Sequence, residues 1–163
     1  MKTINANDRH VVRLNVDGRD VSLSVEPRTN LADGLREELG ITSVRVGCEQ
    51  GICGACSVLI DGVSQRACLT LAVQANGQVV TTAAGLGDEI DDLRDALQHH
   101  FAFQCGFCAS GILITAASWL ANSPEPDEME VRRMLTDNMC RCTGYAGMVK
   151  AILDVATQRR KPD

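Results

Sequence analysis

The sequence has no excess of basic residues and no long run of apolar ones. Its 163 residues include 16 Lys and Arg against 21 Asp and Glu, for a formal net charge of −5. A net negative charge does not favour binding to nucleic acid or to an anionic membrane surface. The longest apolar stretch, Ile112 to Ala121, is too short to span a bilayer. We therefore expect no nucleic-acid partner and no membrane span.

The sequence also lacks a signal peptide and the common catalytic motifs. The N-terminal stretch MKTINANDRH lacks the apolar core of a signal peptide, so we expect a cytoplasmic protein. No Ser/His/Asp set, Cys/His nucleophile or phosphate-binding glycine loop stands out, and we predict no catalytic residue in this chain. What the sequence does have is eight cysteines. The cytoplasm keeps thiols reduced, which favours metal ligands over disulfides.

The first half of the chain is patterned as a small mixed sheet crossed by one helix. Apolar residues alternate on both sides of Asp17-Gly18, and Asp-Gly supplies the positive φ angles that a two-residue hairpin turn needs. A helix should follow, capped by Thr29 or Asn30 and ended by Gly40. The strands are expected at residues 12–16, 21–25 and 57–60 and near 78–82, with a turn at 61–62.

After Gly85 the apolar residues recur at the spacing of an α-helix instead of alternating. Leu93, Ala96, Leu97, His100 and Phe101 recur at helical spacing and predict one buried face. Three more helices are expected, over about 107–120, after a capping box at 127 and 130, and from 148 to 156. The fold class is therefore α+β, with a sheet domain over residues 1–84 and a helical domain over residues 85–163.

The stretch GCEQGICGACS carries the first chemical signal. Cys48, Cys53 and Cys56 are spaced C-x4-C-x2-C, and Cys68 stands beyond a turn. This is the plant-type ferredoxin pattern for a 2Fe-2S cluster. An oxidised cluster held by four thiolates is anionic, so a loop must wrap it and turn backbone N–H groups inward. The glycines of this loop permit the left-handed conformations that such wrapping requires.

A second set is formed by Cys105, Cys108, Cys140 and Cys142, as C-x2-C followed by C-x-C. Each pair precedes an expected helix, so N–H groups at two helix starts could face one anion. Two cysteine pairs also suit tetrahedral zinc. From spacing alone the second set therefore fits either zinc or a 2Fe-2S cluster.

Three motifs in order, GCEQGICGACSVLIDG, FQCGFCASGILITA and NMCRCTGYAGMVKAI, resemble one known family. They are similar to the small iron–sulfur subunit of the xanthine oxidase family of molybdenum hydroxylases, which includes aldehyde oxidoreductases, carbon monoxide dehydrogenases, and quinoline or nicotine dehydrogenases. The resemblance runs from about Val12 to Ala156. It implies two 2Fe-2S clusters, one in an N-terminal β-grasp ferredoxin-like domain and one in a C-terminal four-helix domain.

The resemblance also implies a function and partners. A large subunit with a molybdopterin cofactor would pass electrons singly through the two clusters, the helical-domain cluster first, to FAD on a medium subunit. The chain would be a non-catalytic electron-transfer subunit of an oxidoreductase hetero-oligomer, and one arrangement within the family is a dimer of heterotrimers. Carried over by position, Cys142 would lie closest to the pterin, and Gln104 would hydrogen-bond toward the molybdenum cofactor.

Two other functions remain as alternatives on the residues themselves. One is a free-standing electron carrier with two clusters. The other is a protein-interaction domain stabilised by bound zinc. The chain also departs from the family at Ala109-Ser110, where relatives commonly carry Thr-Pro after the second cysteine of the pair. We expect Ser110 to cap the helix in place of the proline.

Overall fold

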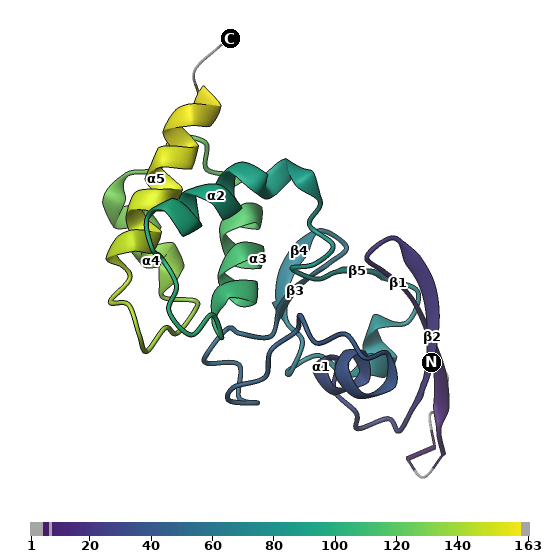
Figure 1. The fold of residues 1–163 in the computed structure, drawn as a ribbon. Coiled ribbons are helices and arrows are strands. Elements are labelled where there is room, and N and C mark those ends of the chain that lie inside the picture. Colours follow the sequence, from purple (N-terminus) through teal and green to yellow (C-terminus); the bar gives the residue numbers. More distant parts are fainter. Residues whose placement is uncertain (1–4, 7, 161–163) are drawn as a thin grey trace.

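The computed structural model describes residues 5–6 and 8–160 and divides them into a sheet half and a helical half (Figure 1). The sheet has five strands in the order β2-β1-β5-β3-β4. Strands β1 and β5 run parallel and the other neighbouring pairs are antiparallel. This order, with a helix lying across one face, is the predicted β-grasp arrangement. The strands are β1 (His10–Val16), β2 (Arg19–Val25), β3 (Ser57–Ile60), β4 (Val63–Arg66) and β5 (Val79–Thr81).

Both predicted Asp-Gly turns form. Asp17 and Gly18 have φ of 50° and 78°, and Asp61 and Gly62 have φ of 49° and 81°. Two consecutive residues with positive φ match the right-handed twist of the flanking strands, which is why each pair closes a two-residue hairpin. The Asp17 carboxylate also accepts hydrogen bonds from the backbone N–H and hydroxyl of Thr82, at 2.7 and 2.8 Å. The first hairpin is thereby attached to the segment that leaves the sheet.

The helix across the sheet begins as predicted, with the Asn30 side chain accepting the Asp33 N–H at 2.8 Å. It is short and irregular, because α1 (Leu31–Asp33) continues as π-helical turns over Gly34–Glu38. A Cβ at Gly34 would lie 3.0 Å from a Leu23 methyl group, so glycine allows this helix to pack closely on the sheet. Gly40, at φ 68°, ends the segment as expected.

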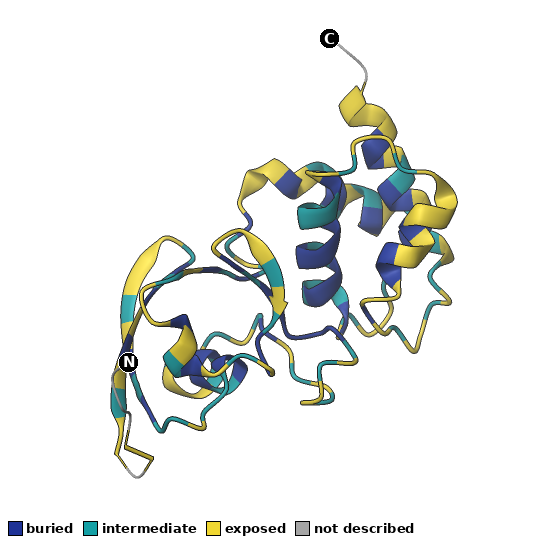
Figure 2. Cartoon of the chain, turned by 180° about the vertical axis from the view of Figure 1, so that it is seen from behind, coloured by how far each residue is buried: buried dark blue, intermediate teal, exposed yellow. Residues whose placement is uncertain are grey.

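The helical half contains four α-helices around one core (Figure 2). Asp127 and Glu130 form the predicted capping box at the start of α4, with reciprocal bonds of 2.8 and 2.9 Å. The five apolar residues predicted to outline the last helix are all buried, namely Met148, Val149, Ile152, Val155 and Ala156. The helices are α2 (Asp91–His99), α3 (Ala109–Leu120), α4 (Glu128–Leu135) and α5 (Ala146–Arg160).

Two details of the helical prediction are wrong. Phe101 was expected on the buried face of the first helix, but that helix ends at His99 and Phe101 is 87% exposed at φ 49°. The left-handed turn points the ring away from the core that holds Leu93 and Leu97. Ser110 does not cap α3, because Cys108 occupies the N-cap position and the Ser110 hydroxyl faces the Ala55 carbonyl oxygen at 3.5 Å.

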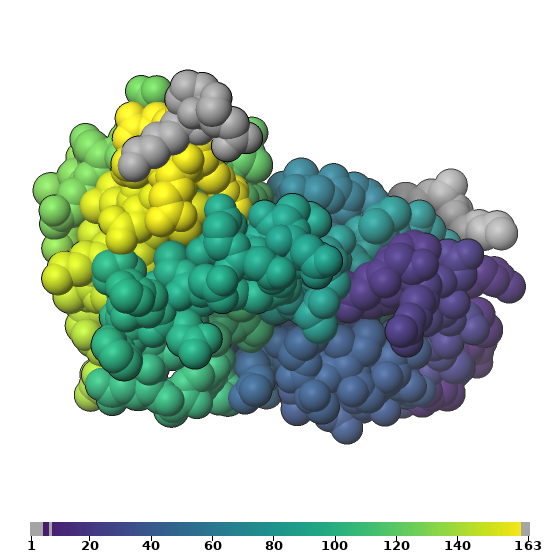
Figure 3. Space-filling model, turned by 45° about the horizontal axis from the view of Figure 1, so that its top comes forward, coloured from purple at the N-terminus to yellow at the C-terminus, as the bar shows by residue number. Residues whose placement is uncertain are grey.

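Two separate hydrophobic cores correspond to the two halves. One is built from β1, β2, α1, β3 and β5, and the other from α2, α3, α4 and α5. In the space-filling view the purple and blue N-terminal residues lie on one side and the green and yellow C-terminal residues on the other (Figure 3). Helix α3 packs against β3 and β4, and the half-buried Leu59 of β3 contacts the helical core. The division at residues 84 and 85 stays a prediction. Within the described residues, no helix combines the length and apolarity needed to cross a bilayer.

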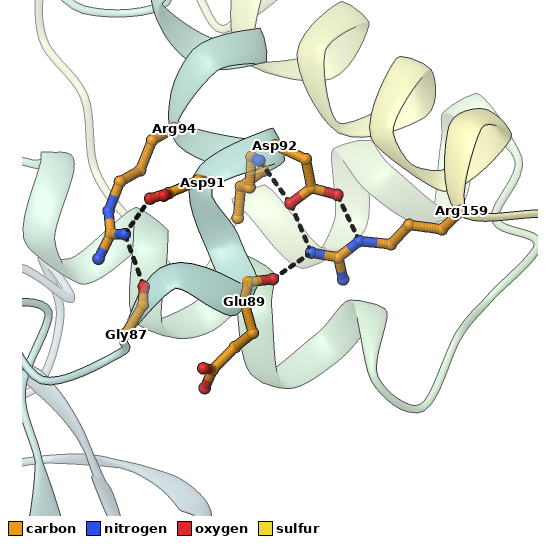
Figure 4. A network of polar contacts seen from close by, with 7 residues as sticks. Gly87, Glu89, Asp91, Asp92, Arg94 and Arg159 are labelled. Atoms are coloured by element: carbon orange, nitrogen blue, oxygen red, sulfur yellow. Dashed lines mark hydrogen bonds and ion pairs between the residues drawn. The ribbon is translucent and has the colours of Figure 1, made fainter.

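Helices α2 and α5 are joined by a bidentate ion pair (Figure 4). Arg159 donates from Nε and Nη2 to the two carboxylate oxygens of Asp92, at 2.7 and 2.8 Å, and from Nη2 to the Glu89 carbonyl oxygen at 3.2 Å. These hydrogen bonds hold the pKa of Asp92 below its ordinary value. Both side chains are about one-third exposed, so solvent screens much of the attraction.

Replacing Arg159 by alanine should therefore lower the free energy of unfolding by about 0.2–1 kcal/mol at neutral pH. Because the folded-state pKa of Asp92 is lowered, the stabilisation is full above the ordinary aspartate pKa of about 4 and is lost as pH falls through the folded-state value. Urea unfolding of both proteins from pH 7 to pH 2.5 tests this. The Arg132→Ala variant removes an exposed i,i+4 pair and is the control. A difference between wild type and Arg159→Ala that persists at the lowest pH would contradict the assignment.

Candidate metal centres

The first cysteine set lies in a loop that runs from residue 47 to the start of β3. Three residues of this loop adopt left-handed conformations, Glu49 at φ 54°, Gly51 at 75° and Gly54 at 72°. The loop turns the backbone N–H groups of Gln50 and Cys53 toward the sulfur of Cys48, at 3.4 and 3.3 Å. These donors lower the pKa of Cys48 to about 7. The glycine-rich stretch thus forms the inward-facing amide cradle that its composition predicts.

Cys56 and Cys68 lie at the buried side of the same loop. Their side chains are 2% and 8% exposed, and the Ala67 N–H donates to the Cys56 carbonyl oxygen at 3.2 Å. Burial raises the pKa of Cys56 to about 11, with further contributions from the neighbouring thiols of Cys68 and Cys53. Cys53 and Cys68 are therefore neighbours of Cys56, and the Cys53 N–H bond to the Cys48 sulfur brings in the fourth cysteine.

Gly47 and Phe107 close the cradle on its outer side. A Cβ at Gly47 would lie 3.3 Å from the Cys53 sulfur and 3.1 Å from the Phe107 ring. Any larger residue would push the chain away from the thiols. Phe107 belongs to the C-x2-C loop of the second set, and the Arg45 guanidinium lies 5.8 Å from its ring centre. The two cysteine loops are therefore neighbours, although about fifty residues separate them in the sequence.

The second set comes from two loops, one before α3 and one between α4 and α5. The sulfur atoms of Cys105 and Cys142 lie 3.5 Å apart. Two thiolates on one tetrahedral metal atom, at a metal–sulfur distance of about 2.3 Å, stand about 3.8 Å apart, so this pair is spaced to share a metal atom. Burial raises the pKa of Cys108 to about 12, and the adjacent Cys140 thiol adds to the rise. The Cys108 and Cys140 thiols thus lie near each other, as do those of Cys105 and Cys142.

The hydrogen-bond donors to the second set come from the loops and not from the helix ends. The Phe107 N–H lowers the pKa of Cys105. Burial works to raise the pKa of Cys140, but the Thr143 hydroxyl, 3.2 Å from its sulfur, and the N–H groups of Cys142 and Thr143 outweigh it. These donors precede α3 and α5 by two or more residues. The backbone N–H groups that stabilise these thiolates thus lie in the loops just before each helix, and not at the helix starts as predicted.

The donor chemistry fits two thiolate-bound clusters. All eight cysteines are free thiols. Burial and crowding oppose ionisation of Cys56 and Cys108, so bound cations are needed to hold four thiolates together. Over residues 5–6 and 8–160, no three His, Cys, Asp or Glu side chains surround one point closely enough to hold a single ion. Individual ligand assignments stay predictions.

The two residues predicted to face the molybdenum cofactor lie at the surface. Gln104 and Cys142 are both exposed, and they belong to the two loops that carry the second set. Sequence reasoning missed a third group at this place, because it depends on contacts between distant segments. Asn138 and Arg66 make hydrogen bonds between distant cysteine-bearing segments, and the Tyr145 hydroxyl bonds to Asn138 and Cys140 within one of them. No local pattern marks them, although Asn138 and Tyr145 stand next to the C-x-C motif.

Comparison with known protein families agrees with two centres. Residues 14–84 match a family described as a 2Fe-2S iron-sulfur cluster binding domain. Residues 82–153 match a second family, described as a 2Fe-2S binding domain. Together with the two thiol groups, these matches define an iron–sulfur protein with two 2Fe-2S-binding domains. A zinc-stapled module is not favoured.

Relatives identify the family. The chain is 42% identical over 159 residues to the nicotine 6-hydroxylase small subunit of Paenarthrobacter nicotinovorans, covering 97% of this chain and 96% of the relative. It is also 42% identical over 154 residues to the caffeine dehydrogenase subunit gamma of Pseudomonas sp., covering 90% and 91%. The chain belongs to the small iron–sulfur subunits of the xanthine oxidase family of molybdenum hydroxylases.

Solved structures agree with this membership. The crystal structure of quinoline 2-oxidoreductase from Pseudomonas putida matches with a TM-score of 0.87 and 45% identity, over 96% of this chain and all of that one. Aldehyde oxidoreductase from Desulfovibrio desulfuricans matches with a TM-score of 0.84 and 40% identity, over 92% of this chain but 17% of that one. The protein is thus a non-catalytic electron-transfer subunit of an oxidoreductase, and a free-standing carrier is not favoured.

Proposed function

We propose that this subunit carries electrons, one at a time, from a molybdopterin site on a large partner subunit to FAD on a medium partner subunit. When bound, each 2Fe-2S cluster supplies a one-electron redox site. The residues proposed as ligands are Cys48, Cys53, Cys56 and Cys68 for one cluster and Cys105, Cys108, Cys140 and Cys142 for the other. The observation that carries the proposal is that all eight cysteines are free thiols, with the Cys142 sulfur 3.5 Å from that of Cys105 and the Cys48 sulfur accepting the Cys53 N–H.

The exposure of the second set supports its position next to the molybdenum cofactor. In the second set Cys105 and Cys142 are exposed, Cys140 is half-buried and Cys108 is buried, whereas the four cysteines of the first set are half-buried or buried. Exposed ligand sulfurs leave one side of the second centre open to a partner. Gln104 lies beside Cys105, and its amide offers both a donor and an acceptor to a pterin. We propose that Cys142 and Gln104 face that cofactor.

Apolar side chains on the cysteine loops support large partner contacts. Ile52, Leu69, Phe107 and Met139 are 42–62% exposed, and each lies within four residues of a proposed ligand. Apolar side chains gathered around functional loops are typical of protein–protein interfaces. We propose a hetero-oligomer with the large and medium subunits, in the cytoplasm, where thiols stay reduced.

We also propose that the two domains divide between residues 84 and 85, which the two separate cores support.

Purification of the tagged chain from its native host tests the partners. We expect a molybdopterin subunit and a flavin subunit to co-purify in fixed proportion. A variant with the exposed Ile52 changed to serine should keep its iron and lose part of the partner yield. A wild-type chain that emerges alone and reduces soluble acceptors would contradict the proposed function.

Metal analysis of the isolated chain tests the clusters directly. With two irons in each of two clusters, we expect about four iron atoms per chain and essentially no zinc. The chain should be produced anaerobically, because exposed thiolates such as those of Cys105 and Cys142 are open to oxidation. A preparation rich in zinc would contradict the assignment of either set.

A further inference from the structure

The loops of the two cysteine sets are bonded to each other at Asn138. The Asn138 side chain is 1% exposed, and its Nδ2 donates to the Gly54 carbonyl oxygen at 3.0 Å. The next residue, Met139, donates its backbone N–H to the Cys53 carbonyl oxygen at 2.8 Å. Met139 directly precedes Cys140. Two adjacent hydrogen bonds therefore connect a proposed ligand of one cluster to a proposed ligand of the other.

Two glycines allow a third segment to reach the same amide. A Cβ at Gly54 would collide with the Asp137 carbonyl oxygen and lie 2.5 Å from Asn138 Nδ2. A Cβ at Gly111 would collide with the Gly54 carbonyl oxygen and lie 2.8 Å from the same nitrogen. Gly111 is in the first turn of α3, three residues after Cys108. The Asn138 amide is thus the point where all three cysteine-bearing segments meet.

Tyr145 ties Asn138 to Cys140. Its hydroxyl donates to the Asn138 backbone carbonyl oxygen at 3.0 Å and accepts the Cys140 N–H at 2.7 Å. One hydroxyl therefore sets the conformation of the short turn between the Asn138 amide and the proposed ligand. Removal of the hydroxyl would release both groups and leave the ring in place.

Arg66 makes a parallel connection from the sheet half. It donates from Nη1 to the Ser57 hydroxyl and from Nη2 to the Asp137 carbonyl oxygen, both at 2.6 Å. The Ser57 hydroxyl in turn donates to the Gly54 carbonyl oxygen at 2.6 Å. Gly54 is therefore held from its own side by Ser57 and from the opposite side by Asn138.

The chain keeps Asn138 at a cost. Its Oδ1 is buried, and among the described residues it has no hydrogen-bond partner. An unsatisfied buried acceptor destabilises a fold, and an apolar residue of similar size would avoid that penalty. The bond from Nδ2 to Gly54 and its place between the ligand loops point to a positional role.

We propose that Asn138, anchored by Tyr145, is a positioning residue that fixes the spacing between the two 2Fe-2S clusters. The inference rests on the proposed function, because it needs both clusters to be bound. Electron transfer between two centres slows steeply as their separation grows. A hydrogen-bonded junction between the ligand loops keeps that separation constant, whereas two domains joined only by a linker would let it vary.

The magnetic interaction between the two reduced clusters tests this. The full chain is loaded with iron and sulfide and reduced with dithionite, and the dipolar interaction is measured from the splitting and relaxation of the electron paramagnetic resonance signals. That interaction falls as the cube of the distance. The variants are Asn138→Ala and Tyr145→Phe, and Asn122→Ala, an exposed asparagine of the same domain, is the matched control.

We expect a clear interaction in wild type and in Asn122→Ala, and its weakening or spread over many values in Asn138→Ala and Tyr145→Phe. All four proteins should keep about four iron atoms per chain. If Asn138→Ala does not fold, Tyr145→Phe decides, since it removes one buried oxygen. An unchanged interaction in a fully loaded variant would overturn the positional role and leave the proposed function intact. A wild-type chain that binds no iron would instead refute the proposed function.

Discussion

Replacing Cys142 by alanine is expected to halve the iron content, from about four atoms per chain to about two. Cys142 is exposed and its sulfur lies 3.5 Å from that of Cys105, so its loss removes one corner of the second thiol group and leaves no buried cavity. The first group draws its donors from a different loop and packs on a different core. The cluster of the helical half should therefore be lost while the ferredoxin-type signal survives.

Iron analysis and electron paramagnetic resonance of the reduced protein measure this effect. The matched control is Arg141→Ala, which changes an exposed neighbour of Cys142 that carries no thiol. It should keep about four iron atoms and both signals. Loss of both signals in Cys142→Ala would argue against two separable domains. An iron content that stays at about four would argue against Cys142 as a ligand.

Replacing Gly54 by alanine should destabilise the protein by about 1–3 kcal/mol more than replacing Gly77 by alanine. Both glycines have positive φ, 72° and 84°, so the two variants share the cost of a left-handed alanine. They differ in their surroundings. A Cβ at Gly77 meets nothing within 4 Å, whereas a Cβ at Gly54 collides with the Asp137 carbonyl oxygen and crowds Asn138. The difference between the variants therefore isolates the packing of the junction.

Thermal unfolding of both variants at one scan rate measures the difference. Each kcal/mol should lower Tm by roughly 2–4 °C for a chain of this length. The Gly54→Ala protein should also show an altered interaction between its reduced clusters, and the Gly77→Ala protein should not. Equal Tm values for the two variants would show that the loops do not approach each other as closely as the structure has them.

Local chemistry accounts for the parts of the fold that the sequence predicted correctly. The Asp17-Gly18 and Asp61-Gly62 turns, the Asn30 cap and the capping box at Asp127 each depend on residues within a few positions. The predictions that were wrong concern ends and orientations. Phe101 fits the helical spacing, but the helix ends at His99. Ser110 lies in the first turn of α3, two residues after the N-cap Cys108.

The sequence by itself determined the two sets of four thiols, the glycines that let the first loop turn its amides inward, and the resemblance that names the family. These features depend only on residue identity and on short distances along the sequence, so they can be recognised without the folded structure. Only the tertiary structure decided where the thiol sets lie relative to each other. The bond from Asn138 to Gly54 joins residues 84 positions apart, and the Arg66 bond to Asp137 spans 71. Such contacts arise from the packing of two separately patterned halves, so no local pattern encodes them.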